Sequence, residues 1–149
     1  HRMDYAKAAP DAFKAVYGLE LFVSDKSGLD ARFRHLIKLR ASQINGCAYC
    51  VDMHTKHAVQ EGYSSQWISM VCVWQESAVY DARERAVLAW TEALTNLSTT
   101  GAPEADYQEL CAQFSDEEVV NISVAISAIN VWNRLGVGFR AQHPVDAAA

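Results

Sequence analysis

Apolar residues recur every three or four positions along nearly the whole chain, which is the period of an amphipathic α-helix. The 149 residues include only 7 glycines and 3 prolines, too few for a turn-rich β-sandwich. No two strand-like runs are joined by a hairpin turn. We therefore predict an all-α protein, a bundle of about six to seven helices with short connections.

Breaks in this periodicity delimit the expected helices. They are residues 11–24, 29–44, 47–60, 64–74, 81–97, 104–114 and 119–135. Capping boxes at Asp81/Glu84 and Ser115/Glu118 mark two helix starts. The last segment is apolar on more than one face, which is typical of a central helix or of one buried in an oligomer interface.

The length suits one domain over residues 1–149, because a domain of this size buries roughly 70% of its unfolded surface. We expect its core at about residues 31–140, preceded by the N-terminal helix 11–24 and followed by a flexible tail at 141–149.

Charge and hydropathy exclude several classes of protein. The formal net charge of −5 argues against a nucleic-acid binder, because such proteins concentrate Lys and Arg. No apolar run reaches the ~18 residues of a membrane span, and no signal segment is visible. We expect a cytoplasmic protein without a membrane partner. Four cysteines are too few for a disulfide scaffold, so in a reducing compartment a close cysteine pair indicates redox or metal chemistry.

The most informative motif is Cys47-x-x-Cys50-x-x-x-His54. On a helix these three residues fall within a sector of about 60°. Cys50 and His54 are four residues apart and therefore neighbours, whereas Cys47 and His54 are two turns apart. The spacing predicts that His54 is the base or hydrogen-bond partner of Cys50, following the pattern of a nucleophile beside a base.

The start of this helix adds a second argument. We expect Asn45 to be the N-cap, which places both cysteines near the positive end of the helix dipole, where a thiolate is stabilised. Because the thiolate is the reactive form, the pair is suited to thiol–disulfide or peroxide chemistry. The dipole favours Cys47 as nucleophile and the histidine favours Cys50, so spacing alone leaves both open.

Zinc is the main chemical alternative, since Cys47, Cys50, His54 and His57 number four. A tetrahedral site takes ligands from converging elements. These four share one straight helix and are too spread to enclose one ion. We therefore expect no metal and no cofactor.

Other candidates have a simpler interpretation beside the functional one. His35 either folds back towards the thiols or lies on the surface in a basic run. Cys72 and Cys111 lack a neighbouring base and are expected to pack in the core, as are the four tryptophans.

Asn130 and Asn133 interrupt an apolar segment, and buried amides need partners. They are expected to support the site, cap a neighbouring helix or line an interface.

Three stretches, residues 36–54, 83–90 and 128–135, resemble the alkylhydroperoxidase AhpD-like branch of the carboxymuconolactone decarboxylase superfamily. The resemblance covers about residues 31–140. It implies an all-helical fold that assembles as a homo-oligomer, a hexamer or a trimer. It also implies reduction of a hydroperoxide, with an external dithiol of lipoyl or thioredoxin-like type as reductant.

The resemblance assigns roles to individual residues. Cys50 is the implied peroxidatic nucleophile, Cys47 its disulfide partner and His54 a member of the proton relay. The family usually places a glutamate twelve residues before the first cysteine, where this chain has His35, and the alkylhydroperoxidase tends to carry a histidine where this chain has Tyr49. A histidine still relays protons near neutral pH but supplies no fixed negative charge.

We therefore predict a thiol-dependent peroxidase. A general disulfide oxidoreductase, or a redox-stress protein with weak peroxidase activity, is the alternative. A lactone-acid decarboxylase using His35 and Arg40 is a further one, but it leaves the cysteine pair without a task.

Overall fold

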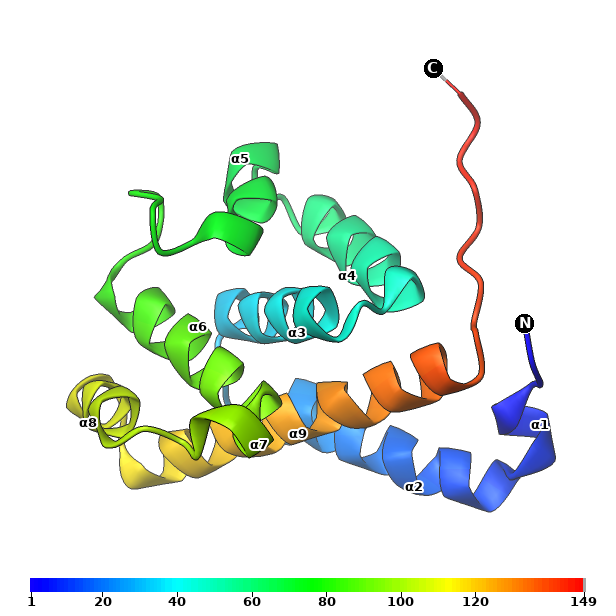
Figure 1. The fold of residues 1–149 in the computed structure, drawn as a ribbon, viewed down its shortest axis with the longest axis horizontal. Coiled ribbons are helices and arrows are strands. Elements are labelled where there is room, and N and C mark those ends of the chain that lie inside the picture. Colours follow the sequence, from blue (N-terminus) through cyan, green and yellow to red (C-terminus); the bar gives the residue numbers. More distant parts are fainter. Residues whose placement is uncertain (149) are drawn as a thin grey trace.

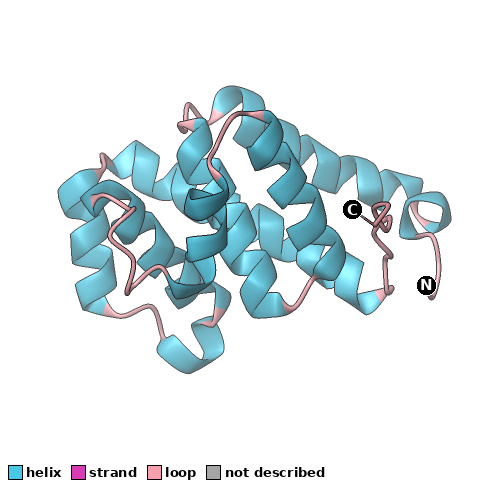
Figure 2. Ribbon diagram, turned by 90° about the horizontal axis from the view of Figure 1, so that it is seen from above, coloured by secondary structure: helices cyan, strands magenta, loops and turns pink. Residues whose placement is uncertain are grey.

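The computed structural model describes residues 1–148, and this part of the chain contains helices and no strand (Figure 2). The all-α prediction is therefore confirmed. Nine α-helical segments follow one another within the described residues, namely α1 (Tyr5–Ala8), α2 (Pro10–Leu21), α3 (Ala31–Asn45), α4 (Ala48–Gln60), α5 (Ser65–Ser69), α6 (Ala82–Thr95), α7 (Leu97–Thr100), α8 (Glu104–Gln113) and α9 (Asp116–Gly138).

The differences from the expected helices are local. Helix α2 continues into a π-helical turn, η1 (Phe22–Lys26), and α5 continues into a 3-10 turn, η2 (Met70–Val73), where one helix over 64–74 is expected. Helices α1 and α7 have four residues each, too few to show a helical period in the sequence.

Helix α9 runs along the lower side of the fold in Figure 1 and packs against α2, α3, α4, α6 and α8. It begins with the predicted capping box, in which Ser115 and Glu118 exchange hydrogen bonds between side chain and backbone. Ile122, Ile126 and Ile129 are buried in the larger apolar cluster. Of the two sequence-based alternatives for this segment, the structure supports the central helix.

Helix α3 also lies inside the fold and joins two apolar clusters. Phe33 and Ile37 belong to the cluster around α9. Leu36 and Leu39 belong to a second cluster, with Val71 of η2 among others. Because α3 is held from both sides, its C-terminal end is a fixed platform for the segment that follows.

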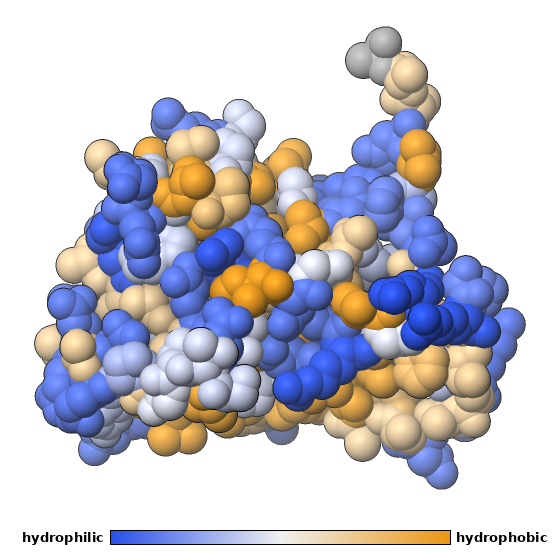
Figure 3. Space-filling model, viewed as in Figure 1, coloured by the Kyte–Doolittle hydropathy of each residue, from blue (hydrophilic) through white to orange (hydrophobic). Residues whose placement is uncertain are grey.

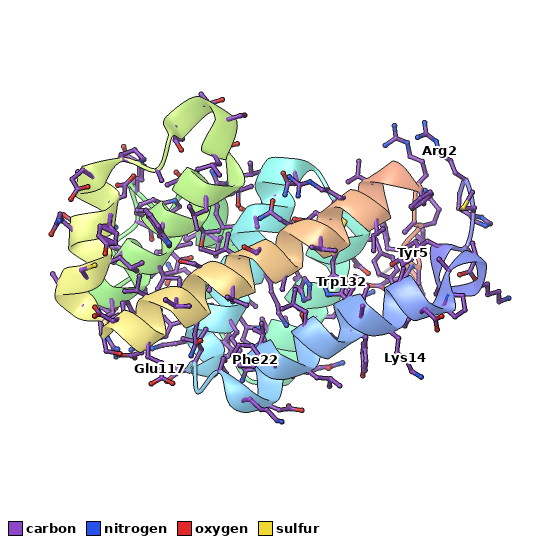
Figure 4. All side chains as sticks on the ribbon, turned by 90° about the horizontal axis from the view of Figure 1, so that it is seen from below. Arg2, Tyr5, Lys14, Phe22, Glu117 and Trp132 are labelled. Atoms are coloured by element: carbon purple, nitrogen blue, oxygen red, sulfur yellow. A yellow bond between two sulfur atoms is a disulfide. The ribbon has the colours of Figure 1, made fainter. Side chains whose placement is uncertain are left out.

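The N-terminal helices are attached to this framework from outside. None of the residues in α1 or α2 is buried, and α2 runs beside α9 (Figure 4). The ring of Phe13 meets Trp132 of α9 edge-on at 5.7 Å between centroids. Beside this contact a space remains between α2 and the inner helices. The candidate site opens into that space.

Polar side chains cover most of the face shown in Figure 3, and apolar residues form small groups among them. In the part of the chain that the structure describes, no helix is both long and apolar enough to cross a membrane.

Candidate active site

The cysteine pair follows a tight turn between α3 and α4. Helix α3 ends at Asn45, and Gly46 has the left-handed conformation (φ 67°) that favours glycine. Cys47 is then the N-cap of α4, because its Sγ accepts a hydrogen bond from the backbone N–H of Cys50 at 3.3 Å. The prediction that Asn45 is the N-cap is wrong, since its side chain turns towards α9.

Buried amides hold this turn against α9. Asn45 Nδ2 donates to Oδ1 of Asn130 and to Oδ1 of Asn133, both at 2.9 Å. Asn133 Nδ2 in turn donates to Ser42 Oγ at 3.0 Å, and Asn130 Nδ2 donates to Thr95 Oγ1 at 3.1 Å. Of the roles expected for Asn130 and Asn133, the structure supports the first, because they brace the turn that carries the cysteines.

Cys47 and Cys50 form a disulfide and are 1% and 3% exposed. Gly136 of α9 faces the pair. A Cβ atom at this position would lie 2.9 Å from Cys47 Sγ and 3.6 Å from Cys50 Sγ. The absence of a side chain at Gly136 therefore lets α9 pass directly over the sulfur atoms. Sequence reasoning missed this residue, although a glycine inside an apolar helix is a recognisable signal.

A cavity of about 310 Å³ lies over Cys50 and His54, between α2 on one side and α4 and α9 on the other. Figure 4 shows Trp132 between α9 and α2. Most of the cavity wall is aromatic or apolar, and this part of the lining comprises Tyr5, Phe13, Tyr17, Tyr49, Met53 and Trp132. Trp132 therefore lines the site as well as packing against Phe13.

His54 is 5% exposed, and neither ring nitrogen has a hydrogen-bond partner among the described residues. Burial, together with the smaller effect of the charges of Lys38, His57 and His35, lowers its pKa from 6.5 to about 3. A neutral imidazole is a proton acceptor. The predicted hydrogen bond between His54 and Cys50 is not present in this disulfide form, although both residues line the same cavity.

His35 is buried and lies outside the cavity lining. Its Nε2 pairs with the carboxylate of Glu61, which follows the end of α4, and its ring meets Tyr63 edge-on at 5.1 Å between centroids. The hydrogen bond to His35 lowers the pKa of Glu61. The structure therefore brings three of the four predicted site residues together, and places His35 in a separate contact with Glu61.

Two charged residues that sequence reasoning did not assign to the site line the cavity. Lys38 Nζ of α3 lies 2.5 Å from Glu20 Oε1 of α2, and the two side chains are only 15% and 22% exposed. In the sequence Lys38 is one member of a basic run, and Glu20 is eighteen residues away on another helix. No local pattern joins them.

The remaining candidates are Cys72, Cys111 and His57. Cys72 is exposed, so its predicted core position is wrong: the 3-10 turn directs its Sγ outwards, where it donates to Ser69 O. Cys111 is half-buried against the larger apolar cluster. His57 is exposed and also lines the cavity. Across residues 1–148, no three His, Cys, Asp or Glu side chains are grouped so that they could hold a metal ion.

Comparison with known proteins gives consistent matches. Residues 8–93 match the sequence model of the carboxymuconolactone decarboxylase family. The uncharacterized protein YdfG of Bacillus subtilis (strain 168) is 33% identical over 136 residues, covering 91% of this chain and 92% of YdfG.

Solved structures agree with the fold. ATU0492 of Agrobacterium tumefaciens is a protein of unknown function for which a role as the antioxidant defence protein AhpD has been suggested. It is 59% identical, with a TM-score of 0.95 over 97% of this chain and 99% of its own. The debrominase Bmp8 shares the fold at 22% identity, with a TM-score of 0.84 over 93% of this chain and 74% of its own.

We expect Asn133→Ala to lower the free energy of unfolding by about 2–3 kcal/mol, because it removes the donor to the buried Ser42 Oγ and one of the two acceptors of the half-buried Asn45 Nδ2. Asn121→Ala is the control, since Asn121 makes a single hydrogen bond, to Ser27 O, and should cost about 1 kcal/mol. Urea denaturation measures both variants. Equal losses would contradict the bracing role.

Gly136→Ala should destabilise the oxidised protein by about 1–3 kcal/mol, because the new methyl group overlaps Cys47 Sγ. Gly138→Ala, two residues further along α9, meets no atom within 4 Å and should be neutral or slightly stabilising. Thermal unfolding followed by circular dichroism compares them. Equal melting temperatures for the two variants would show that α9 does not approach the sulfur atoms closely at Gly136.

The low pKa of His54 predicts a loss of stability in acid. In the unfolded chain this residue binds a proton below pH 6.5, whereas in the folded protein it stays unprotonated down to about pH 3. The free energy of unfolding therefore falls as the pH drops from 6.5 to about 3. Between pH 7 and pH 5 the loss should be about 2 kcal/mol.

In urea titrations at the two pH values, His54→Leu should lack this part of the loss. His143→Leu, at an exposed position, should retain it. A His54→Leu variant with the full acid sensitivity of the wild type would disprove the assignment.

Proposed function

The chain belongs to the carboxymuconolactone decarboxylase family, and from this premise we propose that it is a thiol-dependent hydroperoxide reductase whose redox centre is Cys47 and Cys50. One observation carries the proposal: Cys50 and the buried, unpartnered His54 line the same apolar cavity, with Cys47 bonded to Cys50. This arrangement supplies a nucleophile, a proton acceptor, a resolving thiol and a largely apolar binding space.

The first step oxidises Cys50. Its thiolate attacks the terminal oxygen of a hydroperoxide, the O–O bond breaks, and the products are a sulfenic acid on Cys50 and an alkoxide that takes up a proton. The proton that Cys50 loses passes through the neutral ring of His54 to the alkoxide; because its pKa is lowered, His54 hands the proton on rather than holding it. Cys50 takes this role because it lines the cavity and Cys47 does not.

The second step forms the disulfide. The Cys47 thiolate attacks the Cys50 sulfenic sulfur, the S–O bond breaks, and the departing hydroxide takes up the proton that the Cys47 thiol has lost. Two thiols and one hydroperoxide therefore give a disulfide, an alcohol and water. Cys47 is placed for this attack as the N-cap of α4, where the helix dipole and the N–H of Cys50 stabilise a negative sulfur.

An external dithiol then restores the thiols. One of its thiolates attacks Cys50, the sulfur on the cavity side, and Cys47 leaves as a thiolate at the helix start. The second thiol of the reductant attacks the mixed disulfide and releases Cys50. Because both sulfurs are buried, a dithiol on a narrow arm, such as a lipoyl group, fits this step better than the surface of a folded protein.

The same contacts argue against the alternatives. A general disulfide oxidoreductase must present its sulfurs to protein substrates, and these sulfurs are enclosed. A decarboxylase centred on His35 and Arg40 needs both side chains free to act on one substrate. Instead His35 pairs with Glu61, and Arg40 pairs with Glu92 at 2.8 Å.

Hydroperoxide consumption measured with an excess of dithiol tests the proposal. Cys50→Ser should remove the catalysed rate, and Cys47→Ser should permit one oxidation of Cys50 without turnover. His54→Ala should lower the rate by about a hundredfold or more, the usual contribution of a general base. Cys72→Ser is the control at an exposed thiol outside the site. Unchanged rates in Cys50→Ser or His54→Ala would overturn the proposal.

A further inference from the structure

The Lys38–Glu20 ion pair lines the cavity beside Cys50 and His54, and the steps above give it no task. We propose that Lys38 is a further catalytic residue, whose ammonium group stabilises the Cys50 thiolate and the alkoxide released from the hydroperoxide, and that Glu20 positions it. This inference rests on the proposed function.

The location of the pair is the first argument. Lys38 comes from the middle of α3 and Glu20 from the last turn of α2, so the ion pair joins two of the helices that line the cavity. Both are largely shielded from water. Shielding an ion pair in this way is costly and is weak evidence for a stabilising role. Glu20 also lies just before the π-helical turn η1, a local irregularity that is frequent at functional sites.

The charge balance of the reaction is the second argument. Negative charge gathers first on the Cys50 sulfur and then on the departing oxygen. His54 is buried and neutral, so it offsets neither charge before it has accepted a proton. A fixed positive group in a dry cavity supplies the missing stabilisation. Among the described residues that line the cavity, Lys38 is the only lysine or arginine.

The ionisable groups that surround Cys50 come from four helices. They are Tyr5 of α1, Tyr17 and Glu20 of α2, Lys38 of α3, and Tyr49, His54 and His57 of α4. Helix α9 lines the cavity with Trp132 and Gly136, neither of which is ionisable. His35 acts on the site only through its charge, as one of the groups that lower the pKa of His54.

Lys38 and Glu20 should then shift the pKa of the Cys50 thiol in opposite directions. The positive charge of Lys38 favours the deprotonated form of Cys50. It also lowers the pKa of His54, which keeps that ring neutral. Glu20 offsets part of the Lys38 charge while holding its ammonium group in place. A role limited to packing would make loss of either residue harmful in the same direction.

The test measures the apparent pKa of Cys50 in reduced protein that carries Cys72→Ser and Cys111→Ser. The rate of alkylation by iodoacetamide is followed against pH, and mass spectrometry separates Cys50 from Cys47. Lys38→Met should raise this pKa by about one unit or more, the usual effect of losing a nearby opposite charge, and so slow alkylation near pH 7 by about tenfold. Glu20→Gln should lower the pKa of Cys50, and Lys38→Arg should keep it close to the wild-type value.

Lys56→Met is the matched control, because Lys56 lies on α4 but pairs with Asp52 and Asp146 outside the cavity. It should leave the Cys50 titration unchanged. The inference fails if Lys38→Met has no effect, or if Glu20→Gln and Lys38→Met shift the pKa in the same direction. Glu20→Gln still decides the matter if Lys38→Met does not fold, since an unchanged or raised pKa in that variant also overturns the proposal.

Alkylation requires no hydroperoxide, so the two proposals fail separately. A wild-type protein whose Cys50 responds to Lys38 and Glu20 as described, but which consumes no hydroperoxide, would overturn the proposed function and leave the electrostatic role intact.

Discussion

The hydrogen bonds from Asn45 to Asn130 and Asn133 secure the turn that carries the Cys47–Cys50 pair. They join the end of α3 to the middle of the central helix, in a region where an unpaired amide would be costly. Gly46, which makes the turn, and Cys47, the N-cap of α4, come immediately after Asn45 in the chain. The position of the disulfide therefore depends on this junction. Gly136 then allows α9 to approach the sulfur atoms closely.

The chemistry proposed for the site follows from the burial of Cys50 and His54 beside the cavity. The largely aromatic wall limits contact with water. Burial keeps His54 neutral, and a charge inside the cavity interacts strongly with its neighbours because little water screens it. The wall is completed by α2, a helix without a buried residue of its own, which nevertheless contributes Glu20 and the rings of Phe13 and Tyr17. A helix that contributes no buried residue is thus one side of the cavity that contains Cys50 and His54.

Local patterns predicted what depends on neighbours in sequence. The all-α class and both capping boxes fall in this group, whereas the disulfide between Cys47 and Cys50 was implied by the family resemblance. What depends on distant neighbours was not predictable. Helical spacing places Lys38 on a face of α3 but does not say whether solvent or a cavity lies opposite, and nothing near His35 in sequence points to Glu61.

The most direct test of the central claim is to add one equivalent of an organic hydroperoxide to fully reduced wild-type protein, alkylate the remaining thiols and map all four cysteines by mass spectrometry. The account predicts a disulfide joining Cys47 to Cys50, with Cys72 and Cys111 alkylated. Oxidation of the exposed Cys72 while Cys47 and Cys50 remain alkylated thiols would contradict it.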